Sequence, residues 1–160
     1  MIRITRQDLE FMSRAIGLSA RSAKKRRPDG GPFGAVVVRG RKIIGRGFNR
    51  VLADNDPTAH GEVMAIRDAC RKIKSFDLSG CVLYTSCKPC PMCLAACQWA
   101  NIAQVFYAAE SRDAAKLGFR DSIMYKEFEK PNAGVKIKSC AKQAAEAMHA
   151  WHEKFAKEIY

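Results

Sequence analysis

The order of elements in this chain is clearest around the stretch Cys81-Val82-Leu83-Tyr84-Thr85-Ser86-Cys87-Lys88-Pro89-Cys90-Pro91-Met92-Cys93. Its first five residues form an apolar, β-branched and aromatic run, which predicts a buried strand. Pro91 fits the first turn of a helix, because the N–H that proline lacks is unpaired there. We expect that helix to continue to about residue 100. A strand that leads into a helix is the repeating unit of an α/β layered fold.

The flanking sequence extends this pattern in both directions. A first helix is predicted to start at a capping box formed by Thr5 and Asp8 and to stop before Pro28. The other predicted elements are strands over 34–39 and 42–48 that form a hairpin, a helix over 59–73, a strand over 104–108, irregular or briefly helical chain over 113–133, and a last helix over 142–158. We therefore expect one α/β domain, residues 1–160, with a mixed sheet.

Composition and cysteine content narrow the class of protein. The chain has 160 residues, of which 28% are charged, and no apolar run approaches the length of a membrane span. The N-terminal residues lack the apolar stretch of a secretory signal, so we expect a cytoplasmic protein without a membrane partner. Four of the seven cysteines lie within residues 87–97. In a reducing compartment such a cluster is more typical of metal or redox chemistry than of disulfides.

Positive charge is concentrated in the first third of the chain. The formal net charge is +12, and residues 1–50 carry 13 Lys/Arg against three Asp/Glu, with Lys24-Lys25-Arg26-Arg27 at the centre. Such a patch can attract nucleic acid. A solvated helix end is the simpler interpretation, and we favour it, because a cluster of charges alone cannot recognise a particular nucleic-acid sequence.

A metal site is indicated where two predicted helices begin. His60-Gly61-Glu62 opens one helix, and Cys90 and Cys93 stand three apart at the start of the next. One imidazole and two thiolates fill three of the four positions that zinc prefers, and a water or hydroxide takes the fourth in catalytic sites. Glu62 can then approach that water without being a ligand and move its proton. The pattern H-x-E followed by P-C-x-x-C is the signature of zinc nucleobase deaminases.

Two other interpretations use the same cysteines. Cys87, Cys90, Cys93 and Cys97 have the spacing of a ferredoxin iron–sulfur run, although Gln98 stands where the final proline belongs. Alternatively, Cys87 could complete a structural zinc finger. Neither an iron–sulfur electron carrier nor a zinc finger uses both His60 and Glu62.

With both motifs in place, the chain resembles the cytidine deaminase superfamily, and within it the bacterial guanine deaminases. The resemblance is carried by Asn55-Asp56-Pro57-Thr58-Ala59-His60, Cys90-Pro91-Met92-Cys93-Leu94, Val105-Phe106-Tyr107-Ala108-Ala109-Glu110 and Gly118-Phe119. It implies a three-layer α/β/α fold with a C-terminal helix, one zinc ion per subunit, and a homodimer in which segment 141–160 closes the partner's site. It also implies hydrolytic deamination of guanine, a small purine, with guanosine or tRNA adenosine as the alternative substrates.

The resemblance further implies roles for individual residues. Phe33 would stack on the purine, Asn49 would hydrogen-bond it, and His60, Trp99 and Tyr160 would contribute to the substrate pocket. Asp121 would be a second acidic residue near the amino group, alongside Glu62. The pattern alone favours plainer roles: core aromatics for Phe33 and Trp99, a turn residue for Asn49, and a capping or surface residue for Asp121. Lys88 and Arg120 depart from the family, because they stand at positions that are often acidic.

Overall fold

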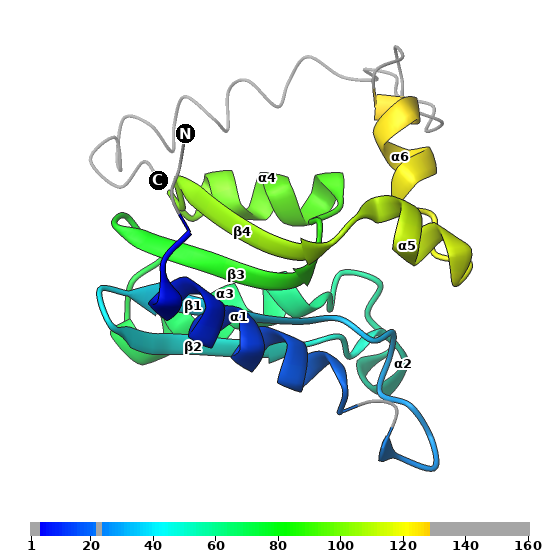
Figure 1. Cartoon of the computed structure of the whole chain (residues 1–160), viewed down its shortest axis with the longest axis horizontal. Helices are drawn as coiled ribbons and strands as arrows, with labels where there is room; N and C mark the ends of the chain where they lie inside the picture. Colours follow the sequence, from blue (N-terminus) through cyan, green and yellow to red (C-terminus); the bar gives the residue numbers. More distant parts are fainter. Residues whose placement is uncertain (1–3, 22–23, 129–160) are drawn as a thin grey trace, which may run out of the picture.

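The computed structural model describes residues 4–21 and 24–128, which form a four-stranded sheet covered by helices (Figure 1). Along the chain the elements are α1 (Arg6–Ser19), β1 (Gly34–Arg39), β2 (Lys42–Phe48), α2 (Val51–Asp54), α3 (Gly61–Ile73), β3 (Cys81–Cys87), α4 (Pro91–Trp99), β4 (Gln104–Ala109), α5 (Ser111–Lys116) and α6 (Asp121–Phe128). No helix in the described part of the chain is both long and apolar enough to cross a membrane.

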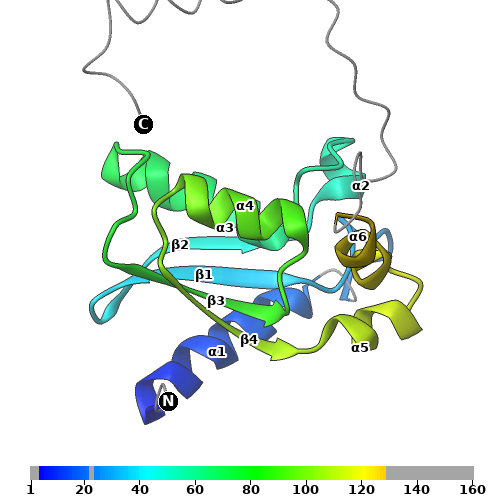
Figure 2. The same ribbon diagram turned by 90° about the horizontal axis from the view of Figure 1, so that it is seen from above.

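The sheet is mixed, as the sequence predicts. Its strand order is β2-β1-β3-β4; β1 pairs antiparallel with both β2 and β3, and β3 pairs parallel with β4. Figure 2 shows α1 on one face of the sheet and α3 and α4 on the other. This is the three-layer α/β/α arrangement of the cytidine deaminase fold.

The topology brings several chain segments together at one end of the sheet, where the carboxyl ends of its parallel strands lie; we call this end of the strands an edge below. The connections through α3 and α4 both cross the sheet in the direction from β2 to β4, so right-handed crossovers place both helices on the same face. Strands β2, β3 and β4 therefore end at the same edge, where Figure 2 also shows α2, α5 and α6. Helices α3 and α4 begin at this edge, and ligand sites of α/β sheets lie at such carboxyl ends.

Two apolar clusters hold the layers together, one on each face of the sheet. Ala35 and Val37 of β1 pack toward α3 and α4, whereas Val36 and Val38 pack toward α1, as the period of two in a strand requires. Gly47 lets α3 lie close to β2: a Cβ there would stand 2.2 Å from the Gly61 carbonyl oxygen. This fit fixes the height of α3, and hence of the residues at its N-terminus, above the sheet.

The predicted strands, the hairpin and the first helix are confirmed, and one short helix was not predicted. Helix α1 starts after its Thr5–Asp8 capping box and ends at Ser19, before Pro28, as predicted. Helix α2 was not predicted; its single turn is held by backbone N–H donation from Leu52 and Ala53 to the Asp29 carbonyl, which local periodicity cannot reveal. The stretch 113–133, predicted to be irregular or briefly helical, contains most of α5 and all of α6. The predicted tail helix over 142–158 lies outside the described residues.

Candidate active site

Three potential metal ligands converge where α3 and α4 begin. His60 is the N-cap of α3, Cys90 is the N-cap of α4, and Cys93 lies in the first turn of α4. The Nδ1 atom of His60 is 3.6 Å from Cys90 Sγ and 3.4 Å from Cys93 Sγ, and all three donor atoms lie within 4.8 Å of one another. Tetrahedral zinc with ordinary Zn–N and Zn–S bonds separates such donors by about 3.6 Å. The donor set and its spacing therefore fit a zinc ion with three protein ligands.

Without a bound cation, the pKa values of the Cys90 and Cys93 thiols shift in opposite directions. The hydrogen bond from Cys93 is the main reason that the pKa of Cys90 falls to about 4, and the hydrogen bond with His60 adds to this effect. The same hydrogen bond raises the pKa of Cys93, together with burial and the nearby Glu62 carboxylate. A divalent cation favours both thiolates at once, and zinc in this position acts as a Lewis acid that lowers the pKa of a water in its open coordination site.

Glu62 is placed as the residue that moves protons beside this site. It lies in the first turn of α3, its residue is 5% exposed, and Thr85 donates a 3.1 Å hydrogen bond to its Oε1. Its Oε2 lies 3.5 Å from Cys93 Sγ. Burial is the main reason that the pKa of Glu62 is raised, with a further contribution from Cys90. A carboxyl with a raised pKa can both accept and return a proton near neutral pH.

The other two cysteines of the 87–97 cluster, Cys87 and Cys97, are not metal ligands. Cys87 donates a 3.7 Å hydrogen bond to the carbonyl of Glu110, and Cys97 is buried in the apolar cluster beneath α4, where burial raises its pKa to about 12. Neither belongs to the group of metal-binding side chains found among the described residues. The ferredoxin-like run and the four-ligand zinc finger are therefore wrong, because each needs Cys87 as a ligand.

A cavity of about 570 Å³ opens from the metal ligands toward α2 and α6. Its lining includes Phe33, Asn49, His60, Glu62 and Cys90, so the structure brings together most of the residues that the sequence assigns to the site. The volume lies within the usual range for small-molecule pockets. These residues come from segments far apart in the sequence, and they meet because each segment ends or begins at the same edge of the sheet.

Asn49 is held in place by the backbone around it. The residue is 4% exposed, its backbone N–H donates to the Phe33 carbonyl, and its Oδ1 accepts hydrogen bonds of 3.2 Å from the N–H groups of Gly31 and Val51. With its oxygen occupied in this way, the amide NH₂ group is the part of Asn49 that can donate to a ligand. Gly30 makes room for this arrangement, since a Cβ there would lie 1.9 Å from Asn49 Oδ1.

Helix α6 and the residues before it contribute a wall that the sequence did not assign. Phe119 packs edge-on against Phe33, with ring centroids 4.7 Å apart, and Arg120, Met124 and Lys88 also line the cavity. Phe119 could have been assigned to the site from sequence, because the Gly118-Phe119 pair is one of the segments that carry the family resemblance. Nothing in the sequence assigns Arg120 or Met124 to the cavity, because their positions there depend on how α6 docks.

Helix α6 is tied to the metal-binding loop through Tyr125. The Tyr125 hydroxyl donates to the carbonyl of Pro89, the residue before Cys90, and the Lys88 ammonium lies 5.2 Å from the centre of the Tyr125 ring. One side chain thus joins the wall of the cavity to the loop that presents a metal ligand.

One predicted site residue lies away from the cavity, and two others fall outside the side chains that the structure describes. Trp99 is the last residue of α4, about 12 Å along the helix from its start, and is 67% exposed. Asp121 begins α6, but its side chain lies outside the described part of the structure, as does all of Tyr160. Their roles remain predictions.

Residues 5–109 match the family described as the cytidine and deoxycytidylate deaminase zinc-binding region. The chain belongs to this family. It is 53% identical over 121 residues to the guanine deaminase of Bacillus subtilis, which covers 76% of each chain. A crystal structure of B. subtilis guanine deaminase superposes with a TM-score of 0.83 and 44% identity over 94% of this chain and 95% of that one. A tRNA-specific adenosine deaminase of Buchnera aphidicola is 40% identical over 92 residues, which covers 58% of this chain and 61% of the relative.

Membership of the cytidine deaminase family agrees with the geometry of the site. The protein is a zinc-dependent deaminase, and the residues that fit the ion are His60, Cys90 and Cys93. The matched region ends before α5 and α6, so the family's shared part covers the metal site and Glu62, while Phe119 and Arg120 lie beyond it. The family match therefore establishes the chemistry better than it establishes the substrate.

Proposed function

We propose that the protein hydrolyses guanine to xanthine and ammonia. The observation that carries this proposal is the likeness to B. subtilis guanine deaminase, which covers 94% of this chain and so extends well beyond the shared deaminase region of residues 5–109. The cavity fits the substrate class: the edge-packed Phe33 and Phe119 offer apolar contact for a flat ring, and Asn49 offers an amide donor. Purine catabolism in the cytoplasm is the setting we infer for this activity.

Glu62 performs the proton transfers in the proposed mechanism. Its carboxylate takes a proton from the attacking water while the new C–O bond forms at the carbon that bears the exocyclic amine. Glu62 delivers that proton to the adjacent ring nitrogen. It then takes the remaining hydroxyl proton and gives it to the amine, the C–N bond breaks, ammonia leaves and the carbonyl forms. The hydrogen bond from Thr85 holds the carboxyl in position through these steps.

Phe33 and Asn49 orient the ring for this attack. The Phe33 ring is fixed against Phe119, and Asn49 Oδ1 is fixed by two backbone donors, so both are preorganised before substrate arrives. Preorganised contacts cost less ordering when the ligand binds. We propose that Asp121 assists departure of ammonia, and that Trp99 and Tyr160 complete the pocket in a homodimer through the exchanged segment 141–160.

The test of this function is ammonia release from a panel of guanine, guanosine, adenine, cytosine, cytidine and tRNA by the zinc-loaded protein. Guanine should be the preferred substrate, and xanthine should form in equal amount. Preference for guanosine, or inosine formation in tRNA, would transfer the assignment to one of the alternatives. Glu62→Gln should retain one zinc per chain and lose turnover, whereas retained turnover would remove Glu62 from the mechanism.

A further inference from the structure

A second hollow, which shares no lining residue with the catalytic cavity, lies on another part of the surface. It has a volume of about 830 Å³ and lies between α1 and β2, with Arg14, Arg41 and Arg46 among its lining residues and the partly buried Phe11 and Ile43 as its apolar part. We call this hollow the arginine groove.

The arginine groove is separate from the deaminase site. Arg41 lies in the turn between β1 and β2, and this turn stands at the edge of the sheet opposite to the one where β2 ends and the metal ligands gather. Helix α1 covers the face of the sheet away from α3 and α4, whose first turns carry the metal ligands (Figure 2). The three arginines therefore cannot serve the reacting purine.

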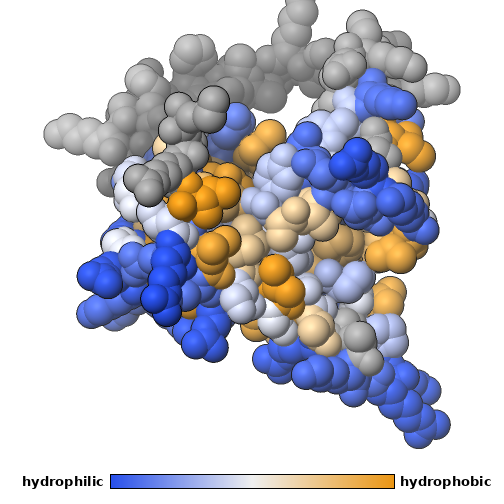
Figure 3. All heavy atoms as spheres, viewed as in Figure 1, coloured by the Kyte–Doolittle hydropathy of each residue, from blue (hydrophilic) through white to orange (hydrophobic). Residues whose placement is uncertain are grey.

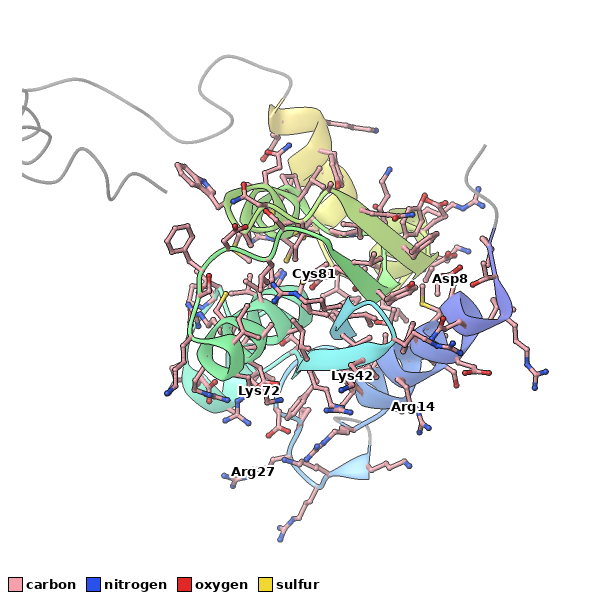
Figure 4. The ribbon with its side chains drawn as sticks, turned by 90° about the vertical axis from the view of Figure 1, so that its left-hand side faces the viewer. Asp8, Arg14, Arg27, Lys42, Lys72 and Cys81 are labelled. Carbon is pink, nitrogen blue, oxygen red and sulfur yellow. The ribbon has the colours of Figure 1, made fainter. Side chains whose placement is uncertain are left out.

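Positive charge is in excess among the described residues that line the groove, which include three arginines and one glutamate. None of its three guanidinium groups forms an ion pair with a carboxylate in the described part of the chain. Glu10 is the one acidic residue in the lining, and it lies 3.7 Å from Arg6. Figure 3 shows hydrophilic side chains gathered over the β1–β2 turn and the start of α1. In Figure 4, Arg14 on α1 and Lys42 on β2 lie on neighbouring elements of the same side.

We propose that the arginine groove binds the phosphate backbone of a single-stranded nucleic acid. Guanidinium groups match phosphate oxygens with paired N–H donors, and a basic groove that carries aromatic side chains is the common form of a single-strand site. Phe11 supplies an aromatic ring that is held in the groove by its contact with Tyr84, with ring centroids 5.4 Å apart. The hollow is concave, which suits a chain of phosphates better than the flat surface of a membrane. This binding is a property separate from deamination.

The test is fluorescence anisotropy with a short labelled oligouridylate, a probe that contains no purine for the catalytic cavity. The zinc-loaded protein should bind it, and the logarithm of the binding constant should fall with that of salt concentration with a slope of about −2, as expected for three phosphate contacts to a single strand. The double variant Arg14→Gln, Arg41→Gln should reduce the slope to about −0.7 and weaken binding at 0.1 M salt by roughly twentyfold.

A control variant with the same net charge distinguishes binding in the arginine groove from general electrostatic attraction to the protein. Arg71→Gln, Arg112→Gln removes two exposed cations from α3 and α5 and should bind within about twofold of the unmodified protein. Thermal melting monitors the folding of both variants, and neither touches the deaminase site. Equal weakening in the two variants, no binding at low salt, or binding to anionic lipid vesicles without binding to oligouridylate would each overturn the proposal.

Discussion

Thr85 Oγ1 donates a buried hydrogen bond of 3.1 Å to Glu62 Oε1, and so links the fifth residue of β3 to the first turn of α3. Thr85 is 1% exposed, which leaves no water to replace its hydroxyl. The bond lowers the pKa of Glu62 slightly against the larger raising effect of burial. A core strand thereby helps to orient the residue that moves protons in the proposed mechanism, while burial is the main influence on the pKa of that residue.

Thr85→Val is expected to slow turnover while leaving the metal site intact. Valine has the shape of threonine without its hydroxyl, so the change removes the hydrogen bond to Glu62 and little else. Hydrogen bonds to charged groups contribute about 1.5–3 kcal/mol, which corresponds to a roughly 10- to 100-fold lower kcat. The measurement is steady-state kinetics of guanine deamination, with zinc content determined on the same sample.

Thr85→Ser is the matched control for this prediction, because serine keeps the hydroxyl and loses only a methyl group. It should retain most of the kcat, and the difference between the two variants isolates the hydrogen bond. Equal kcat for the valine and serine variants would show that Glu62 does not depend on Thr85.

Gly30→Ala should impair substrate binding through Asn49. An alanine Cβ at this position would lie 1.9 Å from Asn49 Oδ1, so the amide must leave the position in which Gly31 and Val51 hold it. We expect the KM for guanine to rise about tenfold or more, as for a displaced hydrogen bond to substrate, with zinc content unchanged.

Gly17→Ala provides the control for an added methyl group, because no atom outside its own helix backbone and chain neighbours lies within 4 Å of a Cβ there. Gly17 lies inside α1, where alanine is favoured over glycine by up to about 1 kcal/mol, so this variant should keep its KM and melt slightly higher. An unchanged KM in Gly30→Ala would contradict the role given to Asn49.

Tyr125→Phe should loosen the wall that α6 adds to the cavity. The change removes the hydroxyl that bonds to the Pro89 carbonyl but keeps the ring beside Lys88. A net loss of about 1 kcal/mol is typical for one such bond, which predicts a roughly fivefold higher KM. Tyr107→Phe is the control: its hydroxyl bonds to Glu110, and neither residue lines the cavity, so its KM should not change. Similar kinetics for the two variants would argue against a positioning role for Tyr125.

The sequence predicts the metal site and the sheet because both depend on local patterns. His60, Cys90 and Cys93 each stand at a predicted helix start, and the alternation of Val36 and Val37 is visible without coordinates. Once β2, β3 and β4 are known to run in one direction, the convergence of those helix starts follows from the crossover rule.

The rest of the site depends on packing between distant segments, which no local pattern encodes. Arg120 and Met124 enter the cavity through the docking of α6 on the Pro89 loop. Trp99 shows the converse: resemblance assigned it to the pocket, and the described chain places it at the far end of α4. A residue assigned by resemblance at such a position needs a partner subunit, or chain beyond residue 128, to act as predicted.

Removal of zinc should expose a reactive thiolate at Cys90. Without the cation, the hydrogen bond from Cys93 lowers the pKa of Cys90 to about 4, so Cys90 is ionised throughout the range from pH 5 to 8, whereas the raised pKa of Cys93 keeps it protonated. Cys90 also lines the cavity, and Cys97 is buried with its pKa raised to about 12. Iodoacetamide at pH 6, followed by peptide mass spectrometry, should label Cys90 first in chelated protein and leave it unlabelled in zinc-loaded protein. Cys90→Ser should abolish this fast labelling. Faster labelling of Cys93 than of Cys90, or equal labelling with and without zinc, would contradict the assignment of these two cysteines.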